Sequence, residues 1–292
     1  MNDDLEQVRT AAARRAAELA LVRVVHHYGG RPEFVLLGGL VPALLCSNSP
    51  KRHAGTSDVD VQVNLEIAGG SVQAPRLEQA LLNAGFEPDA ERVWRWELND
   101  PDGVRATIKL ELLADLDDEP NNATVEFTGC KRLGAANLRG TGYAARDIVI
   151  QKIQAVDHGT RREAEINVTG LAGFLLAKVA AAHGRRKAKD WYDIAFVLLH
   201  NNHGDATAAA ERVLEVFGPP RGEMRTQLLD LQANFADSSA QGTLAYVKQF
   251  IENHPDEDTQ TVATDGQIAI AAFAQRLLRW PTKYPLGIAT IG

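Results

Sequence analysis

Residues 34–67 read FVLLGGLVPALLCSNSPKRHAGTSDVDVQVNLEI, and this stretch decides the fold of the first half of the chain. Residues 34–37 form a short apolar run closed by two glycines, which is typical of a buried strand that turns directly into a helix. After a polar loop, residues 58–67 alternate between polar and apolar side chains, as a strand with one buried face does. The stretch therefore predicts a strand, a glycine turn, a short helix over 40–46 and a second strand.

The second strand is expected to carry two neighbouring carboxylates on one face. Its valines predict the core face, so Asp58 and Asp60 lie together on the opposite face. Two such carboxylates can hold a divalent metal ion, which stabilises the charge of an in-line displacement at phosphorus. The Gly38-Gly39 turn can cradle a triphosphate, because glycine lets the backbone come close and a helix N-terminus attracts anions. Either feature alone is common on protein surfaces, but their order along the chain favours a nucleotidyltransferase site.

The remaining elements indicate an α/β half followed by a helical half. In the first half we expect helices over 3–27 and 75–84, a hairpin of strands 93–98 and 104–113 around a turn at 99–103, and a strand at 124–127. In the second half we expect Thr169 as an N-cap and helices near 170–184, 190–200, 207–217, 222–235, 240–253 and 266–279. We therefore predict two domains, 1–165 and 166–292.

A lysine interrupts the apolar stripe of the first helix in the second half. Lys178 follows Leu171, Phe174 and Leu175 at helical spacing, so it either extends to solvent from the edge of the stripe or has buried partners. Further along, Asp190 and Asp193 stand three residues apart on one helical face. Asp190 is explained by a helix cap alone, whereas Asp193 enters an apolar run and is not. Before them comes a basic segment, which we define as Arg185, Arg186, Lys187 and Lys189 and which could meet RNA phosphates.

Four blocks together resemble a known family. They are residues 37–40 (LGGL), 56–61 (TSDVDV), 175–181 (LLAKVAA) and 186–194 (RKAKDWYDI). In this order they resemble the AbiEii/MenT-type nucleotidyltransferases, the toxins of abortive-infection and toxin–antitoxin systems within the DNA polymerase β-like superfamily. The resemblance implies an α/β (α+β) nucleotidyltransferase domain with a mixed sheet, followed by a helical C-terminal domain that lines the cleft.

The resemblance also implies roles for individual residues. Asp58 and Asp60 would bind Mg²⁺, Gly39 and Ser57 would help hold the triphosphate beside Gly38, and Lys178 and Asp193 would complete the site. The loop before the acidic pair is somewhat long for the family. Which of Lys51, Arg52 and His53 reaches phosphate is therefore left open.

Members of the superfamily often add a third carboxylate from a neighbouring strand. Glu111 is our candidate and Asp115 the second choice. Glu111 could equally be a solvated strand residue paired with Lys109 on the same face. A third carboxylate would act as the base that deprotonates the attacking hydroxyl, a role that Asp193 could take instead.

Composition limits the class of protein. The chain has 292 residues, 45% of them hydrophobic, and a formal net charge of −7, which excludes a surface that binds nucleic acid throughout but not a local basic cleft. No stretch approaches the ~20 apolar residues of a membrane span, so we expect a cytoplasmic protein without a membrane partner. Cys46 and Cys130 match no metal-ligand spacing, and we expect no zinc.

We therefore expect a metal-dependent transfer of a nucleotide from an NTP to an acceptor, with release of pyrophosphate. By resemblance, the acceptor is a tRNA 3′ end or a protein hydroxyl, and an antitoxin protein is a possible partner. Two alternatives stay open: an antibiotic nucleotidyltransferase acting on a cationic aminoglycoside, and a non-catalytic nucleotide-binding regulatory module. The sequence does not decide which NTP is used, the oligomeric state, or the role of residues 200–292.

Overall fold

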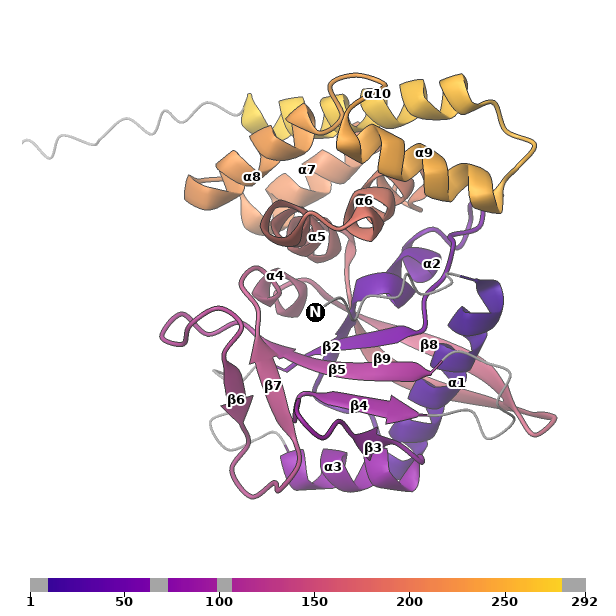
Figure 1. Ribbon diagram of the computed structural model, residues 1–292, viewed down its shortest axis with the longest axis vertical. Coiled ribbons are helices and arrows are strands. Elements are labelled where there is room, and N and C mark those ends of the chain that lie inside the picture. Colours follow the sequence, from indigo (N-terminus) through magenta and orange to yellow (C-terminus); the bar gives the residue numbers. More distant parts are fainter. Residues whose placement is uncertain (1–9, 64–72, 99–106, 280–292) are drawn as a thin grey trace, which may run out of the picture.

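The computed structural model describes residues 10–63, 73–98 and 107–279. A mixed sheet with its helices forms one half of the molecule, and a bundle of helices forms the other (Figure 1). The strands are β1 (Val35–Leu37), β2 (Asp58–Gln62), β3 (Glu87–Pro88), β4 (Arg95–Leu98), β5 (Ile108–Ala114), β6 (Thr124–Glu126), β7 (Gly134–Asn137), β8 (Ile148–Asp157) and β9 (Thr160–Thr169). This architecture confirms the predicted fold class.

The sheet runs in the order β3-β4-β5-β2-β1-β9-β8, and β7 joins β6 to β5 at one end. The central strands β2 and β5 are parallel, as are β1 and β9, whereas β1 and β2 are antiparallel. The predicted alternation in β2 is confirmed. Val59 and Val61 are fully buried in the main core, while Asp58 and Asp60 are partly exposed on the other face. The acidic pair therefore faces away from that core.

Helices α1 (Ala11–Tyr28) and α3 (Ala74–Asn83) pack against each other, and α1 crosses the valine face of the sheet (Figure 1). The side chain of Thr10 accepts a hydrogen bond from the Ala13 N–H and so caps the start of α1. Gly29 ends the helix with a φ of 75°, a left-handed conformation that glycine adopts without strain. A 3₁₀ turn, η1 (Gly38–Leu40), and the short helix α2 (Val41–Leu45) follow β1.

The helical half comprises α5 (Leu171–Arg185), α6 (Ala188–His200), α7 (Ala206–Phe217), α8 (Gly222–Ala233), α9 (Gln241–Asn253) and α10 (Thr259–Leu278). Helix α6 lies inside this bundle, in contact with α5, α7, α9 and α10, and it also reaches α2 of the sheet half. Its buried rings Tyr192 and Phe196 join Tyr246 and Phe250 of α9 in one aromatic cluster. The six helices predicted for this half are confirmed, but α10 begins at Thr259, earlier than the predicted start at 266.

Several elements were not anticipated. The strands β3, β7, β8 and β9 and the short helix α4 (Gly142–Ala145) were missing from the prediction. In β8, Ile148, Ile150 and Val156 are exposed, so its apolar residues do not mark one buried face. In β9, Ala164, Ile166 and Val168 are buried and alternate with polar residues, which is a strand signal that the prediction missed. The turn His158-Gly159, with φ values of 46° and 79°, was the available hairpin signal.

The junction between the strands and the helical half lies at Gly170, not at Thr169 as expected. Thr169 is not the N-cap of α5, because it is still paired in β9, and Gly170 takes the N-cap position. The change from strands to helices thus comes at Gly170, and the division into domains 1–165 and 166–292 stays a prediction. The predicted turn at 99–103 and the outer residues of the predicted segments 3–27, 58–67 and 104–113 lie outside the described residues.

The aromatic cluster leads to a first prediction. Phe196→Ala should destabilise the protein by about 3–5 kcal/mol, because it removes a fully buried ring that contacts both His200 and Phe250. Leu244→Ala on α9 is the control, since Leu244 is 55% exposed and its loss should change stability by about 0.5 kcal/mol or less. Urea unfolding measures both. Equal losses would show that the aromatic cluster does not stabilise the bundle.

Candidate active site

Three carboxylates lie along neighbouring strands on one face of the sheet. The parallel register of β2 and β5 sets Asp60 directly opposite Glu111, and the register of β1 and β2 sets Leu37 opposite Asp60. Asp58 precedes Asp60 on the same face. We call Asp58, Asp60 and Glu111 the acid row. The sequence placed the first two residues together, and the register adds the third.

The glycine turn packs directly against the acid row. A Cβ on Gly38 would lie 1.9 Å from Oδ2 of Asp60, and the φ of Gly38 is 75°. A Cβ on Gly39 would lie 2.9 Å from the side chain of Thr56, two residues before Asp58. Glycine is therefore required at both positions, because any larger side chain would clash with Asp60 or Thr56. The glycine turn and the strand that carries the acidic pair, which the sequence predicted to form one site, are in contact.

Asp60 is held in an environment that disfavours its charge. Burial, followed by the neighbouring charges of Glu111 and Asp58, raises the pKa of Asp60 to about 6, while Lys189 and Lys178 act in the opposite direction. Crowded carboxylates of this kind gain stability from a cation placed between them. Asp60 would therefore be stabilised by a cation bound beside it.

Glu111 is fixed by an arginine from the next strand. Arg95 on β4 lies opposite Glu111, and its Nε and Nη2 donate to Oε1 of Glu111 at 2.8 Å and 2.7 Å. Its partner is therefore Arg95, not the expected Lys109, which lies opposite Asp58 on β2. Asp115 has a different task, because its Oδ2 accepts the N–H groups of Gly140 and Gly142 and shapes the turn before α4.

Asp58 connects the sheet to the helical half. Nζ of Lys189, in the first turn of α6, lies 3.3 Å from Oδ2 of Asp58. Ser57, the residue before Asp58, is buried, and its carbonyl accepts the N–H of Lys109. A cation from the second half thus already neutralises part of the acid row.

Lys178 is a buried cation with two buried carboxylate partners. Its Nζ lies 2.9 Å from Asp190 Oδ1 and 2.8 Å from Asp193 Oδ2. Burial opposes its charge, but the two carboxylates outweigh burial and raise the pKa of Lys178. Arg185 also donates to Asp190, at 2.6 Å and 2.7 Å. The alternative of a lysine that extends to solvent is therefore wrong, and Asp190 is a partner of Lys178, not a helix cap.

His53 completes this network from the sheet half. Its Nε2 lies 2.9 Å from Asp193 Oδ1, and its Nδ1 accepts the N–H of Gly55 at 3.3 Å, which makes Nε2 the donor toward Asp193. The neighbouring Ala54 N–H donates to the Tyr192 hydroxyl at 3.0 Å. His53 is thus buried against α6, and the loop before the acid row is fastened to the helical half.

Most of the other basic side chains considered for phosphate are paired with carboxylates of the chain. Lys51 pairs with Glu257, and the carbonyl of the exposed Arg52 lies 3.0 Å from Nε2 of His254. In the basic segment, Arg186 pairs with Asp230 at 2.8 Å, while Arg185 and Lys189 pair with Asp190 and Asp58 as described. The roles of Lys51, Arg52, Gly39 and Ser57 toward phosphate stay predictions.

The acid row suits Mg²⁺ bound together with a substrate. Within 10–63, 73–98 and 107–279, no three His, Cys, Asp or Glu side chains are gathered as a ready metal cage. Mg²⁺ typically binds through one or two carboxylates plus phosphate oxygens and water, so it does not need such a cage. The oxygen donors of Asp58 and Asp60, with the raised pKa of Asp60, fit this mode of binding.

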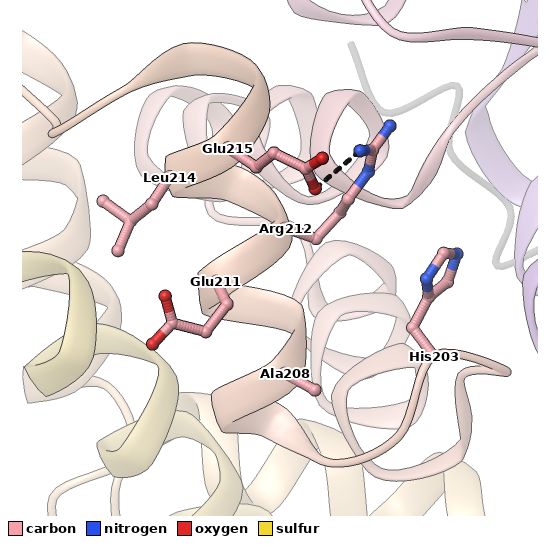
Figure 2. Close-up of a pocket in the computed structure, with 6 residues that line it drawn as sticks. All are labelled: His203, Ala208, Glu211, Arg212, Leu214 and Glu215. Carbon is pink, nitrogen blue, oxygen red and sulfur yellow. Dashed lines mark hydrogen bonds and ion pairs between the residues drawn. The ribbon is translucent and has the colours of Figure 1, made fainter.

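The helical half carries a hollow that lies apart from the acid row. Figure 2 shows its lining, which is His203, Ala208, Glu211, Arg212, Leu214 and Glu215. Arg212 donates to Glu215 at 2.8 Å and also pairs with Asp147, and Glu211 pairs with Arg276. None of the lining residues belongs to the acid row. Because its charged walls are satisfied by each other and by their neighbours, we assign it no chemistry.

Carboxylates on adjacent strands, packed on a glycine turn, form the kind of site that nucleotidyl transfer requires. The family model described as "Nucleotidyl transferase AbiEii toxin, Type IV TA system" matches residues 20–265, which include the acid row, Lys178 and Asp193. The chain belongs to this family of toxin nucleotidyltransferases. No curated protein and no solved structure matches it. Among the described residues, no helix is both long and apolar enough to cross a membrane.

The buried cation network gives a second prediction. Lys178→Ala should destabilise the protein by about 3–5 kcal/mol at pH 7, because it leaves Asp190 and Asp193 buried without their shared cation. The pKa of Asp190 is lowered in the folded protein, so this contribution is present above about pH 4 and is lost as the pH falls further. The difference between variant and wild type should therefore shrink in acid.

Urea unfolding at pH 7 and pH 3.5 measures the effect. Lys152→Ala is the matched control, since Lys152 pairs with Glu163 and Glu165 on the exposed hairpin and should contribute about 1 kcal/mol or less. A Lys178→Ala variant no less stable than the Lys152→Ala variant would contradict this reading of the network.

Proposed function

We propose that the protein transfers a nucleoside monophosphate from an NTP to an acceptor hydroxyl and releases pyrophosphate. The observation that carries this proposal is the contact between Asp60 and Gly38, which sets a carboxylate against the backbone turn expected to receive phosphate. Membership of the family supports the same chemistry. The new bond joins the acceptor oxygen to the α-phosphorus, and the bond from that phosphorus to the β-phosphate oxygen breaks.

Asp58 and Asp60 would hold Mg²⁺, which would supply charge stabilisation at the phosphates. Lys189, beside Asp58, is placed to add positive charge at the same edge of the acid row. Gly38, Gly39 and Ser57 would offer the triphosphate a surface without bulky side chains. These assignments follow from position next to Asp58 and Asp60 and remain proposals.

The proton of the acceptor hydroxyl needs a base. We propose Glu111, because it stands opposite Asp60 on the neighbouring strand. Asp193 is less suited to this role, since one of its oxygens faces Nζ of Lys178 and the other faces Nε2 of His53. We propose instead that Lys178 and Asp193 hold α5, α6 and the loop of His53 in place around the acid row.

The acceptor we propose is a tRNA 3′ end or a protein hydroxyl, with growth arrest as the consequence. Three cations of the basic segment, Arg185, Arg186 and Lys189, are paired with acids of the chain itself, so the segment offers RNA less charge than its sequence indicates. The family description implies a cognate antitoxin as the partner. NTPs and tRNA meet in the cytoplasm, and we propose that the protein acts there.

Label transfer tests the proposed reaction. Purified protein is incubated with each α-labelled NTP, Mg²⁺ and either total RNA or total protein. We expect label to enter one of the two acceptor pools. Asp58→Ala and Asp60→Ala should each reduce transfer by at least about 100-fold, since each removes a carboxylate that would hold the Mg²⁺ that stabilises the charge of the transition state. Asp256→Ala, an exposed carboxylate between α9 and α10, is the control and should leave transfer unchanged.

Each outcome of the label-transfer experiment either supports or contradicts the proposed function. Transfer that survives both Asp58→Ala and Asp60→Ala would contradict the assignment of the acid row. Label in RNA alone or in protein alone would identify the class of acceptor. No label in either pool, with an aminoglycoside labelled instead, would replace the proposed function by antibiotic modification.

A further inference from the structure

A tryptophan lies at the end of the acid row on the same face of the sheet. Trp94, just before β4, packs on a small apolar cluster of Leu37, Leu113, Ala136 and Ala144 that is separate from the main core. Leu37 is opposite Asp60, and Leu113 is two residues beyond Glu111 on the same side of β5. The ring of Trp94 therefore belongs to the face that carries the carboxylates.

Two arginines flank this ring. The guanidinium carbon of Arg95 lies 5.0 Å from the centroid of the Trp94 ring, and that of Arg92 lies 5.9 Å from it. Arg95 is also the residue that holds Glu111. A continuous path of contacts thus runs from Trp94 through Arg95 and Glu111 to the strand of Asp60.

The spacing of this path matches a nucleotide. From β4 across β5 to β2 is two inter-strand steps, roughly 10 Å in total, which is comparable to the span between the base and the α-phosphate of a nucleotide. Trp94 is only partly buried, whereas Trp96, two residues further on, is fully buried in the main core. An accessible indole beside arginine is the kind of surface on which nucleobases stack.

We propose that Trp94 and Arg95 form a stacking subsite for the nucleobase of the NTP whose phosphates lie at Asp58 and Asp60. The inference rests on the proposed function and adds the place of the base to it. Arg92, which lies near the ~6 Å limit of such contacts, is the group that an incoming base would displace from the ring. Stacking is tolerant of base identity, so all four NTPs should use the subsite.

Binding of two probes tests the proposal. Isothermal titration with Mg²⁺ compares each NTP with inorganic tripolyphosphate, which carries the phosphates but no base. Wild type should bind the NTPs more tightly than tripolyphosphate. Trp94→Leu, which keeps an apolar side chain on the cluster, should reduce this preference by roughly 10-fold or more while leaving tripolyphosphate affinity unchanged. Trp94→Phe, which keeps a ring, should restore most of it.

Controls separate stacking from packing. Leu138→Ala removes another partly buried side chain from the same apolar cluster and should keep the preference for NTPs. A Trp94→Leu protein with the wild-type preference would overturn the subsite. So would a Trp94→Leu protein that binds NTPs normally but has lost affinity for RNA, because the base would then come from the acceptor. Wild type that binds neither NTP nor tripolyphosphate would overturn the proposed function itself, and the subsite with it.

Discussion

The contact on which the structure most depends is the buried ion pair of Lys178 with Asp190 and Asp193. A lone buried cation would be strongly destabilising, so each of the three groups requires the others. The network fixes α5 against α6, and through His53 it fixes the loop that leads into β2. The geometry of Asp58 and Asp60 is therefore set by contacts in both halves of the chain.

Contacts from both halves of the chain distinguish β2 from an ordinary exposed strand and make it a candidate active site. On its own, β2 would present two carboxylates to solvent, as many exposed strands do. Here Gly38 lies directly on Asp60, Glu111 stands opposite it, and Lys189 reaches Asp58 from α6. Burial and the nearby charges of Glu111 and Asp58 raise the pKa of Asp60 to about 6, although Lys189 acts in the opposite direction. A cation bound beside Asp60 would therefore stabilise it. On the same face, Trp94 and Arg95 form the subsite that we propose for the nucleobase.

The sequence predicted the parts that depend on local pattern. The alternation of β2, the glycine turn and the six later helices follow from periodicity and turn chemistry, and the blocks around Lys178 and Asp193 were recognisable. It did not reveal contacts that depend on register or on long-range packing. The pairing of Glu111 with Arg95 and the burial of His53 against Asp193 needed the folded chain. The β8–β9 hairpin, by contrast, had a local signal in the His158-Gly159 turn that the prediction missed.

The proposed reaction requires Asp58 and Asp60 to bind a divalent ion together with a nucleotide. Electron paramagnetic resonance with Mn²⁺ and an NTP analogue that resists cleavage between the α- and β-phosphates measures this binding without any acceptor. The wild-type protein should bind Mn²⁺ in the presence of the analogue, and the double variant Asp58→Asn, Asp60→Asn should lose most of that binding. Equal Mn²⁺ binding by the two proteins would contradict the account.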